Sequence, residues 1–508
     1  MNIDKDKKKI TGEQRLGEYN ILLSVLKFIS VVIFIILQVT AICLIFKYKY
    51  FAIVYAVISI IAILHLLLFC KIKEYKLVWF VLIILFPVIG PLLYFLGGNN
   101  LFSKKEKSKL NDIEESNKNI IENSNYIDVK KLNFATNLSR YKVYNNQGIE
   151  FFNTGEDFFY NLIEEMKNAK KSILIDIYIF SKGILLNNIL NVLKEKVKEG
   201  ITVEIIYDEF GSMFRIPKKI KEDIKNSGIK IYTYKKINFN ISDYVNHREH
   251  KKIFLIDGKI AYTGGINIAD EYINKKELHR VWKDGGVKVY GDVATSYLLM
   301  YLKTRQEITS EKIDYKYYIL ERKFSDNKGF VFAYSDGSDN DTNPVPKIYT
   351  DVINKAEKYL YIVTPYFIPN KEIVLAIKNA TKRGVDVKIL LPYIADKNIV
   401  QYANRSYYKE LLDCGVEVYE YKKGFIHTKY MVADNISLVG TANLDYKSLY
   451  FNFECMNLSY KTGIEETIKK EFEIDIKEAI CVTKEDVKHS NILEKMKWCI
   501  ARFLTPLL

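Results

Sequence analysis

Two copies of one short pattern combine the side chains that phosphoryl transfer needs. The copies are His250, Lys252 and Asp257, and, at the same spacing, His427, Lys429 and Asp434. A neutral imidazole can attack phosphorus, and an ammonium group two residues away can hold the charge of the phosphate. Two such units supply two histidines, the number that a two-step displacement at a phosphodiester requires. The pattern therefore indicates phosphoryl-group transfer.

The spacing of His and Lys fits an extended strand. Residues i and i+2 of a strand project to the same face, so His250 points with Lys252, and His427 points with Lys429. The two aspartates close the catalytic motifs, and each comes where its strand should end. We expect Asp257 to brace a turn before Gly258, and its counterpart in the second copy to brace one before Asn435, rather than to touch substrate.

Small and amide residues follow each copy. Gly264 and Gly265 in the first copy and Gly440 in the second allow close backbone approach. Asn267 and Asn443 follow their histidines by 17 and 16 residues. We expect these two amides to donate hydrogen bonds to phosphate oxygens.

A carboxylate should accompany each histidine, because an imidazole that attacks through one nitrogen needs an acceptor for its other N–H. Asp284 follows His250 by 34 residues, and Glu454 follows His427 by 27. Both lie in aromatic, strand-like sequence, where an unpaired buried charge would be costly. We hypothesise that each carboxylate orients one catalytic histidine. The alternative is that both are surface salt-bridge partners.

Three further segments repeat in the same order ahead of each motif, as expected of an internal duplication. The pairs are KKSILIDIYIF (170–180) with EKYLYIVTPYF (357–367), GITVEIIYD (200–208) with GVDVKILLP (384–392), and SGIKIYTY (227–234) with CGVEVYEY (414–421). Helical patterns alternate with these β-branched runs, which predicts an α/β fold. We expect two pseudo-twofold-related α/β domains, residues 134–330 and 331–508, whose catalytic strands meet at their interface.

The first hundred residues have a different composition. Residues 28–46, 50–70 and 77–96 contain no Asp, Glu, Lys or Arg, and each run is close to the ~20 residues that cross a hydrocarbon core. A cleaved signal peptide would have a shorter apolar core and a small-residue cleavage site. Residues 1–99 therefore predict a retained membrane anchor of two to three hydrophobic spans. Buried core helices of a soluble protein are the alternative.

The orientation of these spans is left open by the charges, because lysines flank both ends of the region. Pro87, Gly90 and Pro91 interrupt the last run, which favours a broken or shallow segment there. Two full spans would return the chain to the cytosol, whereas three would place its ends on opposite sides. Residues 100–133 are rich in Lys, Glu, Asn and Ser, which predicts a charged, solvated linker.

The overall charge narrows the class of partner. A formal net charge of +14 favours an anionic partner, and both membrane surface and nucleic acid fit it. The six cysteines form no C-x-x-C pair, so neither a zinc site nor a disulfide framework is indicated. No cluster of Asp and Glu resembles a metal site. We expect no metal and no cofactor.

On these motifs the chain resembles the phospholipase D superfamily, from about residue 134 to the C-terminus, and more closely the bacterial cardiolipin synthases. The segments that carry the closer resemblance are NHREHKKIFLIDGKIAYTGGINIADEY (246–272), TPYFIPN (364–370), GFIHTKYMVADNISLVGTANLD (424–445), WFVLIILFPVIGPLLYFLGG (79–98) and ARFLTPLL (501–508). The departures are Glu249 and Lys251, where Asn and Arg are expected, and Thr441, where Ser is common.

The resemblance implies a phosphatidyltransferase in a bacterial cell membrane, multi-pass, with its catalytic domains on the cytoplasmic side. Its partners would be phosphatidylglycerol and anionic membrane lipid, with no nucleic acid. His250 would attack phosphatidylglycerol and release glycerol, and His427 would act as acid and then as base while a second phosphatidylglycerol completes cardiolipin. The motif lysines would stabilise charge on the phosphate oxygens.

Two other classes of function fit the same motifs. A phospholipase D-type phosphodiesterase would use water in place of the lipid alcohol, with the same residues. Such a hydrolase would cut phospholipid, since the apolar runs argue against nucleic acid as its substrate. A membrane scaffold with a vestigial site is the third class, and the intact His-x-Lys units argue against it.

Overall fold

A computed structural model of the chain describes residues 47–86, 89–98, 104–235, 246–276 and 281–508, with a few isolated positions between 36 and 44. The chain divides into two compact units, Met1–Leu101 and Phe102–Leu508. The hydrophobic run at 28–46 lies almost wholly outside the described residues.

The N-terminal unit contains α2 (Lys49–Phe69), α3 (Lys73–Leu85), α4 (Ile89–Leu93) and a π-helical turn (Tyr94–Gly98). Of the described helices, α2 is the one long and apolar enough to cross a membrane. Its 21 residues extend about 32 Å at 1.5 Å per residue, close to the thickness of a hydrocarbon core. This helix is the anchor candidate that the run at 50–70 predicted.

The last apolar run is broken, as its proline and glycine residues predicted. Helix α3 ends at Leu85 and α4 begins at Ile89. A Cβ at Gly90 would lie 2.5 Å from the carbonyl oxygen of Leu82, so only glycine allows α4 to approach α3 this closely. The break therefore yields two short, packed helices in place of one long span.

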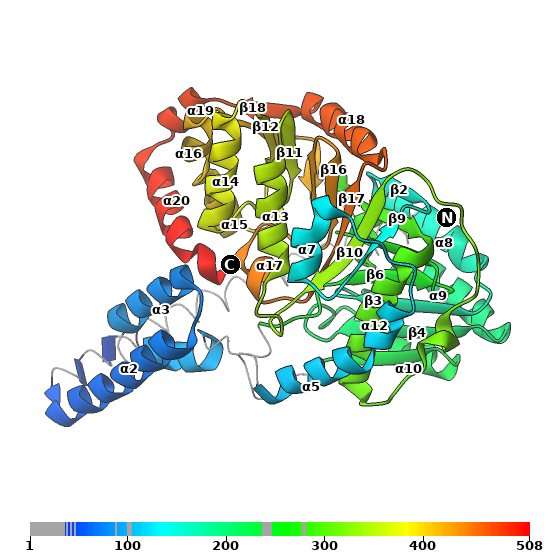
Figure 1. Cartoon of the computed structure of the whole chain (residues 1–508). Coiled ribbons are helices and arrows are strands. Elements are labelled where there is room, and N and C mark those ends of the chain that lie inside the picture. The colour runs from blue at the N-terminus through cyan, green and yellow to red at the C-terminus, as the bar shows by residue number, and fades with distance from the viewer. Residues whose placement is uncertain are drawn as a thin grey trace, which may run out of the picture. The chain divides into compact units, whose positions relative to one another are not determined.

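Two large mixed β-sheets organise the larger unit (Figure 1), beside one two-stranded sheet. The seven-stranded sheet has the order β2-β9-β7-β6-β3-β4-β5. Its strands are β2 (Ile149–Phe152), β3 (Ser172–Ile177), β4 (Thr202–Asp208), β5 (Lys230–Tyr234), β6 (Lys252–Ile256), β7 (Ile260–Gly264) and β9 (Gly286–Tyr290).

The nine-stranded sheet has the order β1-β10-β17-β16-β15-β11-β12-β13-β18. Its strands are β1 (Val143–Asn145), β10 (Phe330–Asp336), β11 (Tyr359–Val363), β12 (Asp386–Pro392), β13 (Glu417–Tyr421), β15 (Tyr430–Ala433), β16 (Ile436–Gly440), β17 (Glu454–Tyr460) and β18 (Ala479–Val482). Without the edge strands β1 and β18, this order matches the first sheet position by position. The α/β class and the internal duplication are thereby confirmed.

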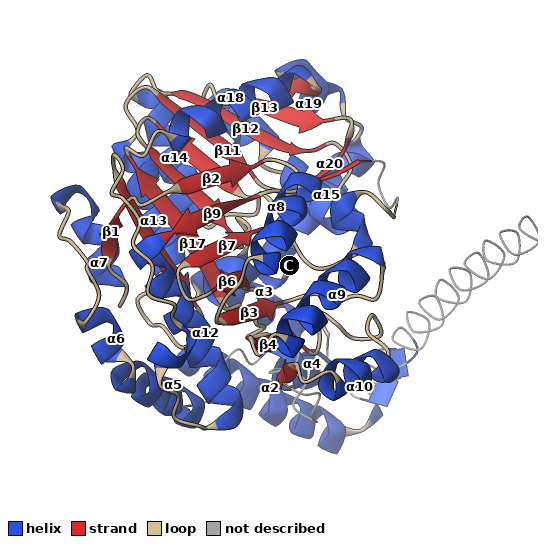
Figure 2. Ribbon diagram, turned by 90° about the vertical axis from the view of Figure 1, so that its right-hand side faces the viewer, coloured by secondary structure: helices blue, strands red, loops and turns tan. Residues whose placement is uncertain are grey.

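Helices cover both faces of each sheet (Figure 2). Those of the first half are α8 (Gly155–Lys167), α9 (Ile184–Lys198), α10 (Lys218–Asn226) and α12 (Ala294–Thr309). Those of the second half are α13 (Pro344–Lys355), α14 (Lys371–Lys382), α15 (Asn398–Arg405), α16 (Tyr408–Asp413), α17 (Tyr446–Tyr450), α18 (Ile464–Lys477), α19 (Lys484–His489) and α20 (Ile492–Leu504).

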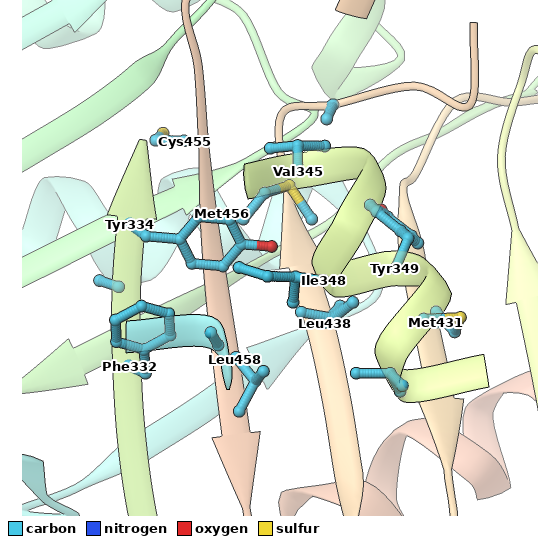
Figure 3. Packing of buried hydrophobic residues seen from close by; sticks show 14 of the residues in the cluster. Phe332, Tyr334, Val345, Ile348, Tyr349, Met431, Leu438, Cys455, Met456 and Leu458 are labelled. Atoms are coloured by element: carbon cyan, nitrogen blue, oxygen red, sulfur yellow. The ribbon is translucent and has the colours of Figure 1, made fainter. Parts of the chain in front are cut away.

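Strand alternation decides which helix each catalytic strand meets. On β6, Phe254 packs against Phe158 of α8 with ring centroids 6.1 Å apart, whereas Ile253 and Leu255 join the central core with α12. On β15, Met431 belongs to that same core. Figure 3 shows it beside the side chains that α13 lays on β10, β16 and β17. Burial on both faces fixes the register of the strands that carry the motifs.

The segment expected to be a solvated linker is instead partly helical and packed. Residues Lys104–Ser116 form α5 and Lys118–Glu122 form α6, and a short α7 follows at Asn133–Leu138. Leu110 of α5 is fully buried. The Asn117 amide between the two helices donates to Gln306 Oε1 of α12 at 2.8 Å. A few tertiary contacts therefore order this segment even though its composition is polar.

Candidate active site

Backbone pairing between the two halves places the first motif beside a carboxylate of the second half. Glu249 forms a parallel bridge with Phe453. The N–H of His250 donates to the carbonyl of Phe453 at 2.9 Å, and the N–H of Phe453 donates to Arg248 at 2.8 Å. Residues that follow a parallel bridge lie side by side, so Glu454 stands next to His250.

The second motif repeats the arrangement with the halves exchanged. Strand β14 (Gly424–Ile426) pairs in parallel with β8 (Val281–Lys283) of the first half. The N–H of His427 then donates to the carbonyl of Lys283 at 2.7 Å. Asp284, the next residue along, stands beside His427.

Each histidine meets the carboxylate of the opposite half. Nδ1 of His250 lies 2.8 and 2.9 Å from the two carboxylate oxygens of Glu454. Nδ1 of His427 lies 2.6 Å from Oδ2 of Asp284. Both carboxylates are fully buried. A neutral imidazole held this way carries its proton on Nδ1 and leaves the lone pair of Nε2 for attack or proton transfer.

The motif lysines lie on the histidine side of their strands. Nζ of Lys252 donates to the carbonyl of His250 at 2.6 Å. Nζ of Lys429 lies 3.3 Å from Nε2 of His427 and also donates to the carbonyl of that residue. Both lysines are buried. Each half therefore presents one imidazole and one ammonium group together.

Burial keeps both imidazoles neutral. It lowers the pKa of His427 to about 4, and the charge of Lys429 adds to this effect while Asp284 opposes it. Burial also lowers the pKa of His250, against the opposing charge of Glu454. At neutral pH both rings are therefore unprotonated at one nitrogen, as a nucleophile or general base must be.

The two lysines hold their protons weakly. Burial lowers the pKa of Lys252 to about 7 and that of Lys429 to about 8. The charge of Lys429 depresses the pKa of Lys252 further, so the two ammonium groups repel each other across the halves. An anion placed between them would relieve this repulsion. The electrostatics therefore favour a bound phosphate.

Each of the two carboxylates has a neighbour suited to it: a hydroxyl that donates a hydrogen bond in one half, and a glycine that leaves space in the other. Thr441 donates its hydroxyl proton to Glu454 at 2.5 Å. Burial would raise the pKa of Glu454, but the ring of His250 and the charge of Lys252 outweigh it and hold that pKa below its usual range. At the equivalent position of the first half, a Cβ on Gly265 would come within 2.2 Å of Asp284 Oδ1. The glycine leaves room for the carboxylate.

Two aromatic neighbours of the histidines were not predicted from the sequence. The ring of Tyr178 meets that of His250 edge-on, with centroids 4.8 Å apart, and the indole of Trp282 lies 5.1 Å from His427. Trp282 stands two residues before Asp284, on the strand that pairs with β14, and this proximity was the available signal. Tyr178 offered none, because its counterpart in the repeat is Pro365.

The two motif aspartates lie away from this centre. Asp257 follows the last residue of β6, about 17 Å along the strand from Lys252 at 3.3 Å per residue. Its carboxylate accepts backbone N–H groups of Lys171 at 2.6 Å and Ser172 at 3.0 Å. Asp434 accepts the N–H of Glu357 at 2.7 Å in the same way. Both carboxylates therefore brace the start of a neighbouring strand, in keeping with the structural role expected of them.

The two asparagines are tied to nearby loops. Asn267 accepts the N–H of Ile179 at 3.0 Å and donates to the Tyr272 hydroxyl at 2.6 Å. Asn443 donates to Asp445 at 3.1 Å. Each amide nitrogen keeps a second hydrogen, so phosphate binding by these residues stays a prediction.

Glu249 and Lys251, two of the three departures from the family pattern, face away from the histidine. They form an ion pair of 2.7 Å, and Lys251 also donates to Thr304 of α12 at 3.0 Å. The paired charges therefore belong to the α12 side of the strand. Among the described residues, no group of three His, Cys, Asp or Glu side chains could hold a metal ion.

Comparison with known families agrees with this geometry. The family model described as "Cardiolipin synthase, PLD-like domain" matches residues 162–290 and 349–476, one copy in each half. A second model, "Phospholipase_D-nuclease N-terminal", matches residues 57–99, which include most of α2 and the broken segment after it.

Relatives with assigned names and a solved structure extend the match. The chain is 31% identical to cardiolipin synthase 2 of Bacillus cereus, over 85% of this chain and 86% of that protein. It is 32% identical to cardiolipin synthase of Clostridium perfringens, over 85% and 93%. The crystal structure of phosphatidylserine synthase from Haemophilus influenzae shares the fold, with a TM-score of 0.56 and 17% identity over 75% of this chain and 100% of that one. The chain therefore belongs to the cardiolipin synthase family of proteins with paired phospholipase D-like domains.

Proposed function

We propose that this protein is a membrane phosphatidyltransferase that condenses two phosphatidylglycerol molecules into cardiolipin and glycerol. The observation that carries the proposal is the pair of imidazoles whose Nδ1 atoms lie 2.8 Å from Glu454 and 2.6 Å from Asp284. The relatives that are named cardiolipin synthase support this choice of product.

The first step transfers the phosphatidyl group to the protein. Nε2 of His250 attacks the phosphorus of one phosphatidylglycerol, and an N–P bond forms as the P–O bond to the head-group glycerol breaks. The leaving oxygen takes a proton from His427. The pKa of His427 is about 4 without substrate, and the negative charge of a bound phosphodiester raises it, so His427 takes up its proton as substrate binds.

The second step returns the phosphatidyl group to a lipid. A hydroxyl of the head-group glycerol of a second phosphatidylglycerol gives its proton to His427, now neutral, and attacks the phosphorus. The N–P bond breaks, cardiolipin leaves, and His250 is regenerated. Lys252 and Lys429 hold the charge of the non-bridging oxygens in both steps, and positioned donors of this kind contribute ~3–4 kcal/mol each.

The site needs no group outside the chain for these steps. The histidines supply the nucleophile and the proton shuttle, and the lysines supply positive charge. We assign the N-terminal unit to the bacterial cell membrane as a multi-pass anchor, with the catalytic unit on the cytoplasmic side, where anionic lipid is abundant. The helix α2 supports the membrane anchor in this assignment.

One experiment separates the proposed reaction from its alternative. Purified full-length protein is incubated in detergent micelles with phosphatidylglycerol as the sole lipid, and the products are separated by chromatography. Cardiolipin and glycerol in equal amounts are expected. Phosphatidic acid in place of cardiolipin would mean that water is the acceptor and that the protein is a phospholipase D-type hydrolase. Absence of turnover, in protein shown to be folded, would overturn both.

A further inference from the structure

Helix α20 (Ile492–Leu504) exposes a continuous apolar stripe near the C-terminus. Ile492 is 76% exposed, Leu493 65%, Met496 55% and Ile500 56%. At 100° per residue these four side chains fall within an arc of about 100° on one side of the helix. Water-exposed aliphatic residues gathered this way are costly unless something covers them.

The opposite side of α20 is fixed to the catalytic unit. Ala501 is fully buried. The guanidinium of Arg502 lies 3.3 Å from the ring centroid of Tyr407 and donates to Glu410 at 3.1 Å. These contacts set the rotation of the helix about its axis. The stripe therefore faces outward because these contacts hold the opposite side of the helix, and not because the helix end is frayed.

Lysines border the stripe on both sides. On the helical wheel Lys495 falls about 60° before Ile492 and Lys497 about 40° beyond Leu493. Nζ of Lys495 caps the carbonyl of Lys488 at 2.8 Å, and Nζ of Lys497 lies 5.4 Å from the ring centroid of Tyr402. An apolar face bordered by lysines is the pattern of a helix lying in the interface of an anionic bilayer, because the long stems reach the head groups.

Helix α20 has as its neighbour a segment that reaches toward the active site. Helix α20 packs against α15, and the two lie side by side in Figure 2. The loop just before α15 carries Ile394, which is 60% exposed, and Asp396, which accepts the hydroxyl of Tyr366 at 2.8 Å. The charge of Asp396 also acts on His427. The loop next to α15 thus combines an exposed aliphatic side chain, Ile394, with a carboxylate whose charge acts on His427.

We infer that α20 is an interfacial helix, with Ile492, Leu493, Met496 and Ile500 inserted into the head-group region of an anionic bilayer. It gives the catalytic unit a membrane contact of its own, separate from the helix α2. The contact turns the loop of Ile394 toward the lipid, so that a lipid substrate need not leave the bilayer to reach His427. The inference concerns membrane docking, and it stands whether the acceptor is lipid or water.

The test uses the full-length protein in nanodiscs that contain phosphatidylglycerol. The exposed residues Cys43, Cys481 and Cys499 are replaced by serine, and an environment-sensitive fluorophore is attached at Ile500→Cys. The matched control is Ile474→Cys on α18, a residue with a similar exposure of 53%. Quenching is measured with nitroxide on the lipid chains and with iodide in the water.

The expected result is that the label at position 500 emits to the blue, is quenched by the lipid nitroxide and is protected from iodide. The label at position 474 should show the reverse. Strong iodide quenching at 500 would overturn the inference, since the stripe would face water. Protection from both quenchers would also overturn it, because the N-terminal unit or a second copy of the chain would then cover the helix.

A charge test supports the optical one. The double substitution Lys495→Glu with Lys497→Glu should reduce nitroxide quenching at position 500 in anionic nanodiscs. The quenching should then equal that of the protein with both lysines intact, measured in phosphatidylcholine nanodiscs. Equal quenching in both lipids for both proteins would contradict a role for the lysines. None of these readouts depends on turnover, so a failure here is distinct from a failure of the proposed reaction.

Discussion

Glu454 stands 204 residues after His250, yet its Oε1 lies 2.8 Å from Nδ1 of that ring. The reciprocal pair, His427 and Asp284, is separated by 143 residues and lies at 2.6 Å. Each half therefore lends its carboxylate to the histidine of the other. Neither half contains a complete pair, so the proposed chemistry requires both halves of the chain.

The crossed pairs predict the effect of removing either carboxylate. Glu454→Gln and Asp284→Asn should each lower kcat by about 10²–10⁴-fold, because an amide can donate to Nδ1 and leave the ring in the wrong tautomer. Turnover of phosphatidylglycerol measures this loss. The control is Glu222→Gln, whose side chain is exposed and pairs only loosely with Lys218 at 3.6 Å. Activity within twofold of the unaltered protein in the first two variants would end the proposed role.

The assignment of His250 as nucleophile predicts where a covalent adduct forms. A phosphatidyl donor with a nitrophenol leaving group needs no general acid, so His427→Ala should still be loaded by it. The adduct should persist, since the base that activates the acceptor is missing. Mass spectrometry after quenching in a mildly alkaline denaturant, in which the N–P bond persists, should find the phosphatidyl group on His250, and His250→Ala should form none. A label on His427 in the His250→Ala protein would reverse the assignment.

The lowered lysine pKa values predict an alkaline limb in activity. Lys252 has a pKa of about 7 and Lys429 one of about 8, so both ammonium groups lose protons as the pH rises through that range. The value of kcat/KM, which reports the free enzyme, should therefore fall between about pH 7 and 8. In kcat the same limb should move to higher pH, because the bound phosphodiester raises both pKa values. A flat kcat/KM profile up to pH 9 would contradict the charged role of these lysines.

The same values predict that one catalytic lysine costs stability. The folded pKa of Lys252 is about 7 against 10.5 for the ordinary side chain, so the unfolded chain binds more protons between those pH values. Stability then rises with pH across that window, and the penalty is fully present below pH 7. Lys252→Met should abolish turnover while raising the unfolding temperature at pH 7, with the gain shrinking toward pH 10. A lower unfolding temperature at pH 7 would show that the charge is stabilising.

Local patterns in the sequence predicted the His-Lys pair within each half, but they did not predict the contacts between the halves. His250 and Lys252 share a strand face because of the two-residue period of a strand, and this needs no knowledge of the fold. The cost of burying a charge was enough to name Asp284 and Glu454, but it did not tell which histidine each carboxylate would contact. Which half supplies Glu454 depends on the parallel bridge between Glu249 and Phe453, a contact between distant residues that leaves no periodic trace.

The fold was predictable to a similar depth. Repeated strand segments predicted the duplicated sheets, since β-branched runs in a fixed order constrain topology. The prediction of a solvated linker at residues 100–133 was wrong because composition reports only average polarity. In α5 a single side chain, Leu110, is fully buried, and the Asn117 amide after it donates one hydrogen bond to Gln306. A few such contacts are invisible in an average over thirty residues.

The positions of the motif aspartates predict a loss of stability without a loss of chemistry. Asp257 accepts backbone N–H groups at the start of β3, including Lys171 at 2.6 Å and Ser172 at 3.0 Å, and its own φ is 52°. Asp257→Asn keeps one acceptor oxygen and tolerates this left-handed backbone, so it should cost about 1 kcal/mol. Asp257→Ala keeps neither advantage and should cost about 2–4 kcal/mol.

Thermal unfolding in detergent measures both costs, and turnover is compared at a temperature below every transition. There, both variants should keep kcat within about twofold, because the carboxylate lies about 17 Å along the strand from the motif lysine. A loss of kcat in folded Asp257→Asn as large as that of Glu454→Gln would place Asp257 in the chemistry. The most recognisable carboxylate of the motif should thus matter to the fold, and the less conspicuous one across the seam to the reaction.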